Sequence, residues 1–325
     1  MNITVILCTY NRCQSLAKAL ESVAAQTLPE SVEWEVLVVD NNSRDQTREV
    51  VEDFCRRHPG HFRYLFEPQQ GKSYALNAGI REARGEVLAF MDDDVTVEPT
   101  WLINLTAPLR DGEWAGAGGR ILLEGTFSSP RWLALDGPYS MGHTLYAHFD
   151  LGDQPLELGR APFGTNMAFR KEIFEKYGAF RTDMGPSPGS EIRHEDAEFG
   201  HRLLAAGERL CYEPSAVVYH PAPENRVQKD YFLTWWFDFG RAVVREWGRG
   251  RAVLGIPRLY LKILKLGTIV MAERLGGWML SMNPQKRFYN KCWVWATAGQ
   301  IKESYRLARS AQAKKEDSIS KCRAT

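Results

Sequence analysis

The sequence predicts an α/β fold, in which a mostly parallel central sheet is flanked by helices, followed by a helical C-terminal extension. Through the first 95 residues, short apolar runs rich in β-branched residues alternate with stretches of helical periodicity, a pattern typical of buried parallel strands joined by helices. The charge also changes sign along the chain, because residues 1–224 hold 21 basic and 33 acidic residues whereas residues 225–325 hold 20 and 7. We therefore expect an acidic α/β domain over residues 1–224 and a basic helical extension over residues 225–325.

The individual elements follow from local periodicity and from the turn residues at their ends. Strands are expected at residues 5–7, 36–39, 62–66, 87–91, 115–123, 209–212 and 217–219. Helices are expected around residues 16–23, 50–54, 72–84, 171–177 and 195–206, and in the extension at 231–247 and 257–282. Ser43 and Gln46 have the spacing of a capping box and are predicted to begin the second of these helices.

Polar side chains follow four of the predicted strands at the point where each strand ends. They are Thr9, Tyr10, Asn11 and Arg12 after the first strand, Asp40, Asn41, Asn42 and Ser43 after the second, Asp92, Asp93 and Asp94 after the strand at 87–91, and His220 after the last. In an open parallel sheet, ligands bind at the carboxyl ends of the strands. A single cluster could be an ordinary turn, because Asp and Asn begin turns and cap helices, and for Asp40 alone the two interpretations stay balanced.

Three successive carboxylates at residues 92–94 are harder to explain as a turn. Directly after a buried strand they repel one another and lack the solvation of a surface acidic run. A divalent cation resolves this conflict, because hard cations bind carboxylate oxygens and bridge them to phosphates. A solvated acidic turn is the alternative. His220 taken alone is more typical of a packing histidine, although its place at a strand end beside prolines also fits a metal ligand.

Taken in order, six short motifs resemble those of the family 2 glycosyltransferases of GT-A fold. The segments that carry the resemblance are residues 5–12, 38–43, 71–79, 90–94, 164–170 and 194–203. They cover roughly residues 1–222, and the resemblance rests on their order and spacing, since each motif alone is short. It implies an inverting enzyme that moves one sugar from a nucleotide-diphosphate sugar, expected to be UDP-linked, to a hydroxyl acceptor.

The resemblance also implies a donor site at the strand ends. Asp40 would hydrogen-bond the base, and Asp92 would contact the ribose region. Asp94 and His220 would hold Mn²⁺ or Mg²⁺ against the diphosphate. Lys72 would support the same charge, with a surface lysine at a helix start as the alternative. The full set expected to bind the donor nucleotide is Thr9, Tyr10, Asn11, Arg12, Asp40, Asn42, Lys72, Asp92 and Asp93.

On the acceptor side, the resemblance implies Asp196 as the general base that removes a proton from the attacking hydroxyl, with Glu195 as an alternative base. Adjacent carboxylates raise one another's pKa, which brings a base nearer to the operating pH. Without the other motifs, both residues would be explained by the preference of acids for the first turn of a helix. Gly164, Thr165 and Asn166 are expected to lie on the acceptor side.

Transfer of a single sugar is favoured over polymerisation, because the chain lacks the Q-x-x-R-W motif and the transmembrane helices of the processive synthases in this family. No uncharged apolar stretch reaches the length of about 18 residues that predicts a spanning helix. The first residues do not resemble a secretory signal. We therefore expect a cytoplasmic protein acting in polysaccharide or glycoconjugate biosynthesis, with a polyprenyl-linked glycan as one candidate acceptor.

The basic extension has two interpretations that the sequence leaves open. On the predicted helix at 257–282, Arg258, Lys262 and Lys265 share one face, and apolar residues cover the remainder. Such a helix suits the interface of an anionic membrane, here the cytoplasmic face of the inner membrane, to which the protein would attach peripherally. Alternatively, the helices pack their apolar faces on the catalytic domain. We expect no nucleic acid among the partners.

Three rival functions explain fewer of these residues. A nicotinamide dehydrogenase would need G-x-G-x-x-G after the first strand, where residues 8–11 read Cys-Thr-Tyr-Asn. A sugar-phosphate nucleotidyltransferase would carry a glycine-rich phosphate loop near its start, and none is present. A non-catalytic nucleotide-sugar-binding protein would not need Asp94, Asp196 and His220 together. The last two functions remain the alternatives to glycosyl transfer.

Overall fold

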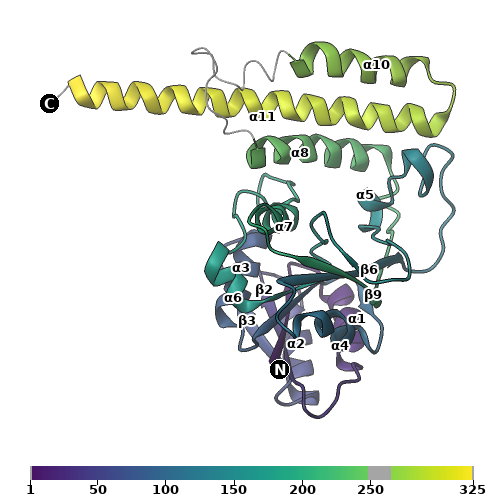
Figure 1. Ribbon diagram of the computed structural model, residues 1–325, viewed down its shortest axis with the longest axis vertical. Coiled ribbons are helices and arrows are strands. Elements are labelled where there is room, and N and C mark those ends of the chain that lie inside the picture. Colours follow the sequence, from purple (N-terminus) through teal and green to yellow (C-terminus); the bar gives the residue numbers. More distant parts are fainter. Residues whose placement is uncertain (1, 248–264, 324–325) are drawn as a thin grey trace. The chain divides into compact units, whose positions relative to one another are not determined.

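The computed structural model describes residues 2–247 and 265–323. It divides into two compact units (Figure 1). The first unit consists of the described residues up to 127 together with 143–223, and the second consists of 128–142 together with the described residues from 224 onward. The second unit thus takes in a short segment that precedes the predicted boundary at residue 224 by about 80 positions.

The first unit is built on a mixed sheet whose nine described strands run in the order β3-β2-β1-β4-β8-β6-β9-β5, with β7 paired to β9. The strands are β1 (Asn2–Thr9), β2 (Glu33–Asp40), β3 (Phe62–Phe66), β4 (Val87–Asp92), β5 (Thr96–Val97), β6 (Gly116–Leu123), β7 (Leu156–Glu157), β8 (Met167–Arg170) and β9 (Leu210–His220). Strands β3, β2, β1 and β4 are parallel, as are β6 and β9. Strand β8 is antiparallel to both β4 and β6. The predicted parallel arrangement therefore describes the N-terminal half, and β8 makes the sheet mixed.

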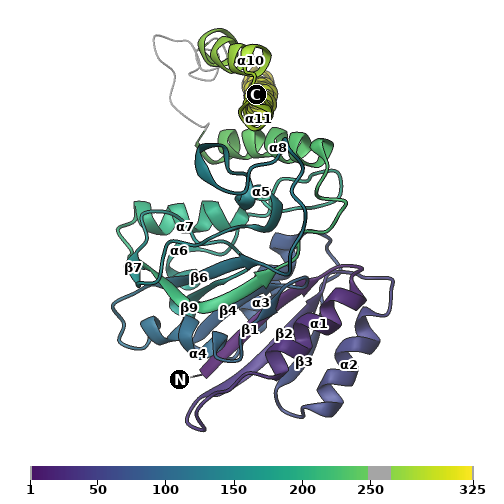
Figure 2. The same cartoon turned by 90° about the vertical axis from the view of Figure 1, so that its right-hand side faces the viewer.

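Helices cover both faces of this sheet (Figure 2). They are α1 (Cys13–Ala24), α2 (Thr47–Arg57), α3 (Lys72–Glu82), α4 (Trp101–Thr106), α6 (Lys171–Tyr177) and α7 (Glu195–Ala205), with a 3₁₀ turn at Ala107–Leu109. A 3₁₀ turn at Gly137–Tyr139 and the short helix α5 (Gly142–Tyr146) lie between β6 and β7 in the chain. Successive strand residues face opposite sides, so Val5 belongs to the apolar cluster that holds Leu16 of α1, whereas Ile6 belongs to the one that holds Phe199 of α7. The predicted α/β class with helices on the sheet is confirmed.

Two local predictions are wrong. The segments at 209–212 and 217–219 form one strand, β9, because the sheet accommodates the intervening Glu-Pro-Ser-Ala as an irregularity, in which Gly119 pairs with Glu213 and Arg120 already pairs with Val217. The capping box is also absent. Helix α2 begins at Thr47, and Asp45 accepts hydrogen bonds from the backbone N–H (3.1 Å) and hydroxyl (2.6 Å) of that threonine.

The second unit is helical. It contains α8 (Lys229–Trp247), a π-helical turn at Leu266–Val270, α10 (Met271–Leu280) and α11 (Pro284–Arg323). Helix α8 confirms the predicted helix at 231–247. Of the predicted helix at 257–282, residues 257–264, including Arg258 and Lys262, lie outside the described residues, and the remainder is helical to Leu280. No helix among the described residues combines the length and the apolar character needed to cross a membrane.

Helices α8 and α11 pack closely because glycines face the opposing backbone. A Cβ atom at Gly240 would collide with the carbonyl of Ala296, and one at Gly299 with the carbonyl of Phe237. Beside this contact lies a buried carboxylate, that of Glu303. Burial alone would raise its pKa, but ion pairs with arginines lower the pKa to about 2. Its partners are Arg241, Arg245 and Arg306.

Candidate functional site

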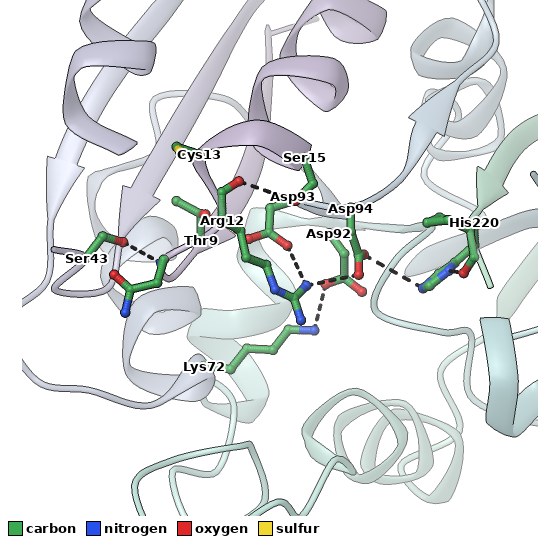
Figure 3. Close-up of polar contacts among 12 residues, drawn as sticks. Thr9, Arg12, Cys13, Ser15, Ser43, Lys72, Asp92, Asp93, Asp94 and His220 are labelled. Carbon is green, nitrogen blue, oxygen red and sulfur yellow. Dashed lines mark hydrogen bonds and ion pairs between the residues drawn. The ribbon is translucent and has the colours of Figure 1, made fainter. Parts of the chain in front are cut away.

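The strand register brings the predicted donor residues together at one edge of the sheet. Thr9 at the end of β1 lies beside Asp40 at the end of β2, and Cys8 lies beside Asp92 at the end of β4. The turn after β4 then places Asp94 opposite His220, the last residue of β9 (Figure 3). Residues that are more than 200 positions apart in the chain therefore share one polar cluster, as expected for the carboxyl ends of parallel strands.

Asp94 and His220 have the geometry of a metal-ligand pair. The Asp94 Oδ1 and His220 Nε2 atoms lie 3.8 Å apart, within the range of about 3 to 4 Å available to two ligands that each lie about 2.1 Å from one ion. The Nδ1 atom of His220 lies 2.8 Å from the Pro221 carbonyl, to which it donates in the tautomer this contact requires. That tautomer directs the Nε2 lone pair toward Asp94. Carboxylate oxygens suit Mg²⁺ and Mn²⁺, and an imidazole ligand shifts the preference toward Mn²⁺.

Asp93 is buried and is engaged inside the protein. Its Oδ2 atom accepts a hydrogen bond from the Thr9 hydroxyl (2.7 Å), and its Oδ1 atom accepts one from Arg12 Nη1 (3.0 Å). Burial raises the pKa of Asp93 to about 6, although the Arg12 guanidinium acts to lower it. The same Arg12 nitrogen lies 3.0 Å from Asp94 Oδ2. The side chains of Thr9 and Asp93, predicted to bind the donor, are thus bound to each other.

Lys72 links the acidic turn, which consists of residues 92–94, to helix α7. Its Nζ atom donates to Asp92 Oδ1 at 2.7 Å and lies 3.6 Å from Glu195 Oε1. Burial alone would lower the pKa of Lys72 and raise that of Asp92. Their ion pairing reverses both effects, so the pKa of Lys72 rises above its usual range and that of Asp92 falls to about 2. Lys72 is therefore no ordinary surface lysine.

The turns after β1 and β2 are joined to each other. Asn11 and Asn42 both have a positive φ, at 53° and 67°, a conformation that Asn tolerates better than most residues. The Asn11 backbone N–H donates to the Ser43 hydroxyl, and the Asn11 side-chain oxygen accepts from the Arg44 backbone. Ser43 is therefore recruited to this turn rather than to a helix cap. Tyr10 is 46% exposed beside it.

Asp40 is buried below this turn, with both oxygens engaged. Oδ1 accepts from the Ser43 backbone N–H at 2.9 Å, and Oδ2 accepts from the Tyr64 hydroxyl at 2.8 Å. These contacts orient the carboxylate at the place where the base was predicted to bind. Tyr64 was missed by the sequence argument, and only its place within the predicted strand at 62–66 hinted at its proximity.

Asn41 was named among the strand-end residues but was not included in the set expected to bind the donor. It is buried, donates to the carbonyls of Glu67 and Gln69, and accepts from the Gly71 backbone N–H at 2.7 Å. It thereby ties the Asp40 turn to the start of α3, where Lys72 follows. The sequence signal for this role was the position of Asn41 inside the 38–43 motif. Its partners lie about 30 residues away in the chain, so the spacing within the motif does not reveal them.

Glu195 and Asp196 open helix α7 in different environments. Glu195 is buried, its Oε2 atom accepts from the His194 backbone, and burial raises its pKa to about 6 against the lowering effect of Lys72. Asp196 is partly exposed, and its Oδ2 atom accepts from the Gly164 backbone N–H at 2.7 Å. Glu195 is therefore a buried carboxylate with a raised pKa, and Asp196 is the carboxylate that solvent reaches.

The predicted acceptor residues Gly164, Thr165 and Asn166 lie in different environments. Gly164 orients Asp196, and the added Cβ of any other residue there would lie only 3.1 Å from the Asp196 carboxylate. Thr165 is buried. Asn166 is fully buried, accepts from the Trp101 indole and donates to the carbonyls of Arg120 and Ala216. This contact set ties the residue that precedes β8 to β6 and β9, and the placement of Asn166 on the acceptor side stays a prediction.

Residues 4–178, more than half of the chain, match the family model for glycosyl transferase family 2. The chain belongs to this family. Membership supports glycosyl transfer as the activity and confirms the resemblance drawn from the six motifs.

Two curated relatives cover most of this glycosyltransferase. It is 30% identical over 227 residues to the succinoglycan biosynthesis protein ExoM of Rhizobium meliloti, covering 70% of this chain and 69% of that protein. It is 28% identical over 250 residues to a glucosyl-dolichyl phosphate glucuronosyltransferase of Haloferax volcanii, covering 75% and 77%. The first name refers to succinoglycan biosynthesis and the second to glucuronosyl transfer.

Solved structures show the same fold. The mannosyltransferase PcManGT of Pyrobaculum calidifontis, in complex with GDP-Man and Mn²⁺, aligns with a TM-score of 0.60 at 18% identity, covering 92% of this chain and 86% of that one. GalNAc-T7, solved with UDP, GalNAc and Mn²⁺, aligns with a TM-score of 0.57 at 16% identity, covering 92% and 56%. The GT-A fold predicted for this glycosyltransferase is confirmed.

Proposed function

We propose that this glycosyltransferase is metal-dependent and inverting, and that it moves one sugar from a UDP-linked donor to a hydroxyl acceptor. One observation carries the proposal most directly. The Lys72 ammonium lies between Asp92 of the acidic turn and Glu195 of helix α7. A single cation therefore connects Asp92, proposed to contact the ribose region of the donor, with the helix proposed to supply the base.

The roles follow from charge and exposure. Asp94 and His220 would hold Mn²⁺ or Mg²⁺, which when bound neutralises charge that develops on the departing diphosphate. Lys72 adds a fixed positive charge on the same side. Asp196 removes the proton from the acceptor hydroxyl as that oxygen attacks the anomeric carbon, and one displacement with one base inverts the configuration there.

We assign the base to Asp196 because an acceptor can reach it. The Gly164 N–H holds one of its oxygens and so fixes the direction of the carboxylate. Glu195 is buried and contacts Lys72 and the His194 backbone, so its function would be to keep the lysine in place. A base must come within hydrogen-bond distance of the proton it removes, and geometry therefore outweighs the raised pKa of Glu195.

Two substrate classes are supported by different arguments. A UDP-linked donor is proposed from the family resemblance of the Asp40 turn. A lipid-linked acceptor is proposed from the Haloferax relative, whose name places its substrate on dolichyl phosphate. Succinoglycan biosynthesis, named for the Rhizobium relative, supports a role in polysaccharide assembly.

Thermal shift with a panel of nucleotide sugars separates this function from its alternatives. UDP-sugars should raise the melting temperature in the presence of Mn²⁺ more than in its absence, because ligand and metal both bind only the folded state. The stabilising donor should then release UDP when a hydroxyl acceptor is added. Release of pyrophosphate from UTP and a sugar phosphate would instead indicate a nucleotidyltransferase, and binding without any release would indicate a binding protein.

We also propose that the second unit attaches to an anionic membrane. Its exposed apolar side chains gather around α10 and the turn that follows, where Leu280 is 82% and Met282 97% exposed. Three exposed basic residues belong to the same part of the chain, namely Lys265, Lys286 and Arg287. Such attachment needs two contributions. Apolar side chains enter the membrane interface, and basic side chains bind the anionic headgroups.

Flotation with liposomes tests this attachment in the full-length protein. Protein should float with vesicles containing anionic lipid and not with neutral vesicles, and salt should weaken the binding. Leu280→Asp should reduce the floated fraction about tenfold, since it replaces an inserting apolar side chain with a charge. The matched variant Leu151→Asp, at an exposed leucine of the first unit, should float normally. Equal flotation of both variants, or none by the wild type, would leave α10 as a surface with no membrane role.

A further inference from the structure

Arg12 lies at the centre of a chain of polar contacts that runs from β1 to the end of β9 (Figure 3). The Thr9 hydroxyl donates to one oxygen of Asp93, and Arg12 Nη1 donates to the other. The same nitrogen donates to Asp94 Oδ2 at 3.0 Å, while Asp94 Oδ1 faces His220 at 3.8 Å. Both oxygens of Asp94 are thus directed, one to the arginine and the other to the histidine.

The two ends of this chain are firmly placed. Asp93 is buried, so the guanidinium has a fixed anchor on the protein side. His220 is buried as well, and its Nδ1 contact with the Pro221 carbonyl sets the ring orientation. Between them, the Asp94 side chain could rotate and present either one oxygen or both to a cation. The contact with Arg12 removes that choice, because it engages Oδ2.

We propose that Arg12 is a positioning residue for the metal site: it engages Oδ2 of Asp94, so that Oδ1 faces His220, the other residue that would hold the cation. Asp93 and Thr9 act through Arg12 and not on the nucleotide. This inference rests on the proposed metal site and reassigns three residues that the sequence argument placed among the nucleotide ligands. Partners that orient a metal ligand commonly affect metal affinity by about 10- to 100-fold.

Arg12 could also lower the affinity for the metal. Arg12 is a cation beside two carboxylates, and its side chain is 45% exposed. A cation that merely competes for the site would weaken metal binding, and its removal would strengthen it. A direct nucleotide ligand would change UDP affinity even without metal. The sign of the change in metal affinity therefore separates positioning from competition, and UDP affinity without metal separates positioning from direct binding.

Titration calorimetry with Mn²⁺ on the full-length protein measures that sign. Arg12→Gln should weaken Mn²⁺ binding at least tenfold, and Asp93→Asn should weaken it by a smaller factor because the arginine loses its anchor. UDP affinity without metal should stay at the wild-type value in both variants. The control is Arg44→Gln, an exposed arginine of the neighbouring turn whose backbone alone contacts Asn11, and it should bind Mn²⁺ normally.

Each outcome has one consequence. Unchanged or tighter Mn²⁺ binding by Arg12→Gln overturns the positioning role while leaving the metal site intact. A loss of metal-free UDP binding in that variant makes Arg12 a nucleotide ligand and also overturns it. Absence of Mn²⁺ binding in the wild type, with or without UDP, overturns the proposed metal dependence itself. Should Arg12→Gln fold poorly, Asp93→Asn and the isosteric Thr9→Val, both expected to weaken Mn²⁺ binding, provide the same test.

Discussion

Asp94→Asn is expected to abolish sugar transfer and to remove the Mn²⁺-dependent part of the stabilisation by UDP. Asparagine has nearly the same shape as aspartate, and its amide oxygen can still accept from Arg12, so the fold should persist. What disappears is the negative charge of a ligand that lies 3.8 Å from His220 Nε2. Hard divalent cations depend on that charge for affinity.

Transfer assays and thermal shift with UDP, each with and without Mn²⁺, measure the two effects separately. Asp111→Asn is the matched control, because that aspartate is exposed on a turn, and it should behave as the wild type. Wild-type turnover by Asp94→Asn in Mn²⁺ would show that the acidic turn does not hold the metal. Loss of turnover with unchanged Mn²⁺-dependent stabilisation would give Asp94 a role other than metal binding.

Asp196→Asn is expected to bind the nucleotide sugar normally and to lose transfer by about 10²- to 10⁴-fold, the usual contribution of a positioned base. The amide oxygen can keep the hydrogen bond from the Gly164 N–H, so the loss would report the missing proton acceptor and not a moved side chain. Steady-state transfer rates, together with donor affinity measured by calorimetry, check the two halves of this expectation.

Glu195→Gln provides the comparison at the neighbouring position. We expect a smaller loss, because the change weakens the contact with Lys72 at 3.6 Å but leaves the stronger one between Lys72 and Asp92 at 2.7 Å. If instead Glu195→Gln is the more damaging substitution and Asp196→Asn retains most activity, the base is Glu195. In that case the pKa of about 6 produced by burial would describe the catalytic group.

Much of the fold followed from the sequence because local signals and global structure agree. Apolar runs at residues 5–7, 36–39 and 87–91 lie within β1, β2 and β4, since strands buried on both faces need continuous apolar side chains. The predictions at residues 43–46 and 209–219 failed for a common reason. A helix cap and a break between strands are predicted from neighbouring residues alone. Ser43 and the segment around Pro214 instead take their conformations from partners that are distant in the chain, namely the Asn11 turn and strand β6.

The sequence by itself determined that polar groups cluster at the strand ends of an α/β sheet, and its motifs were enough to indicate the family. Only the tertiary structure decided what each carboxylate of the acidic turn contacts: Asp92 pairs with Lys72, Asp93 with Thr9 and Arg12, and Asp94 with Arg12 and His220. The sequence Asp-Asp-Asp at residues 92–94 does not indicate in which direction each side chain points. As the chain leaves β4, the three side chains meet different sets of partners, which come from the turn after β1, the start of α3 and the end of β9.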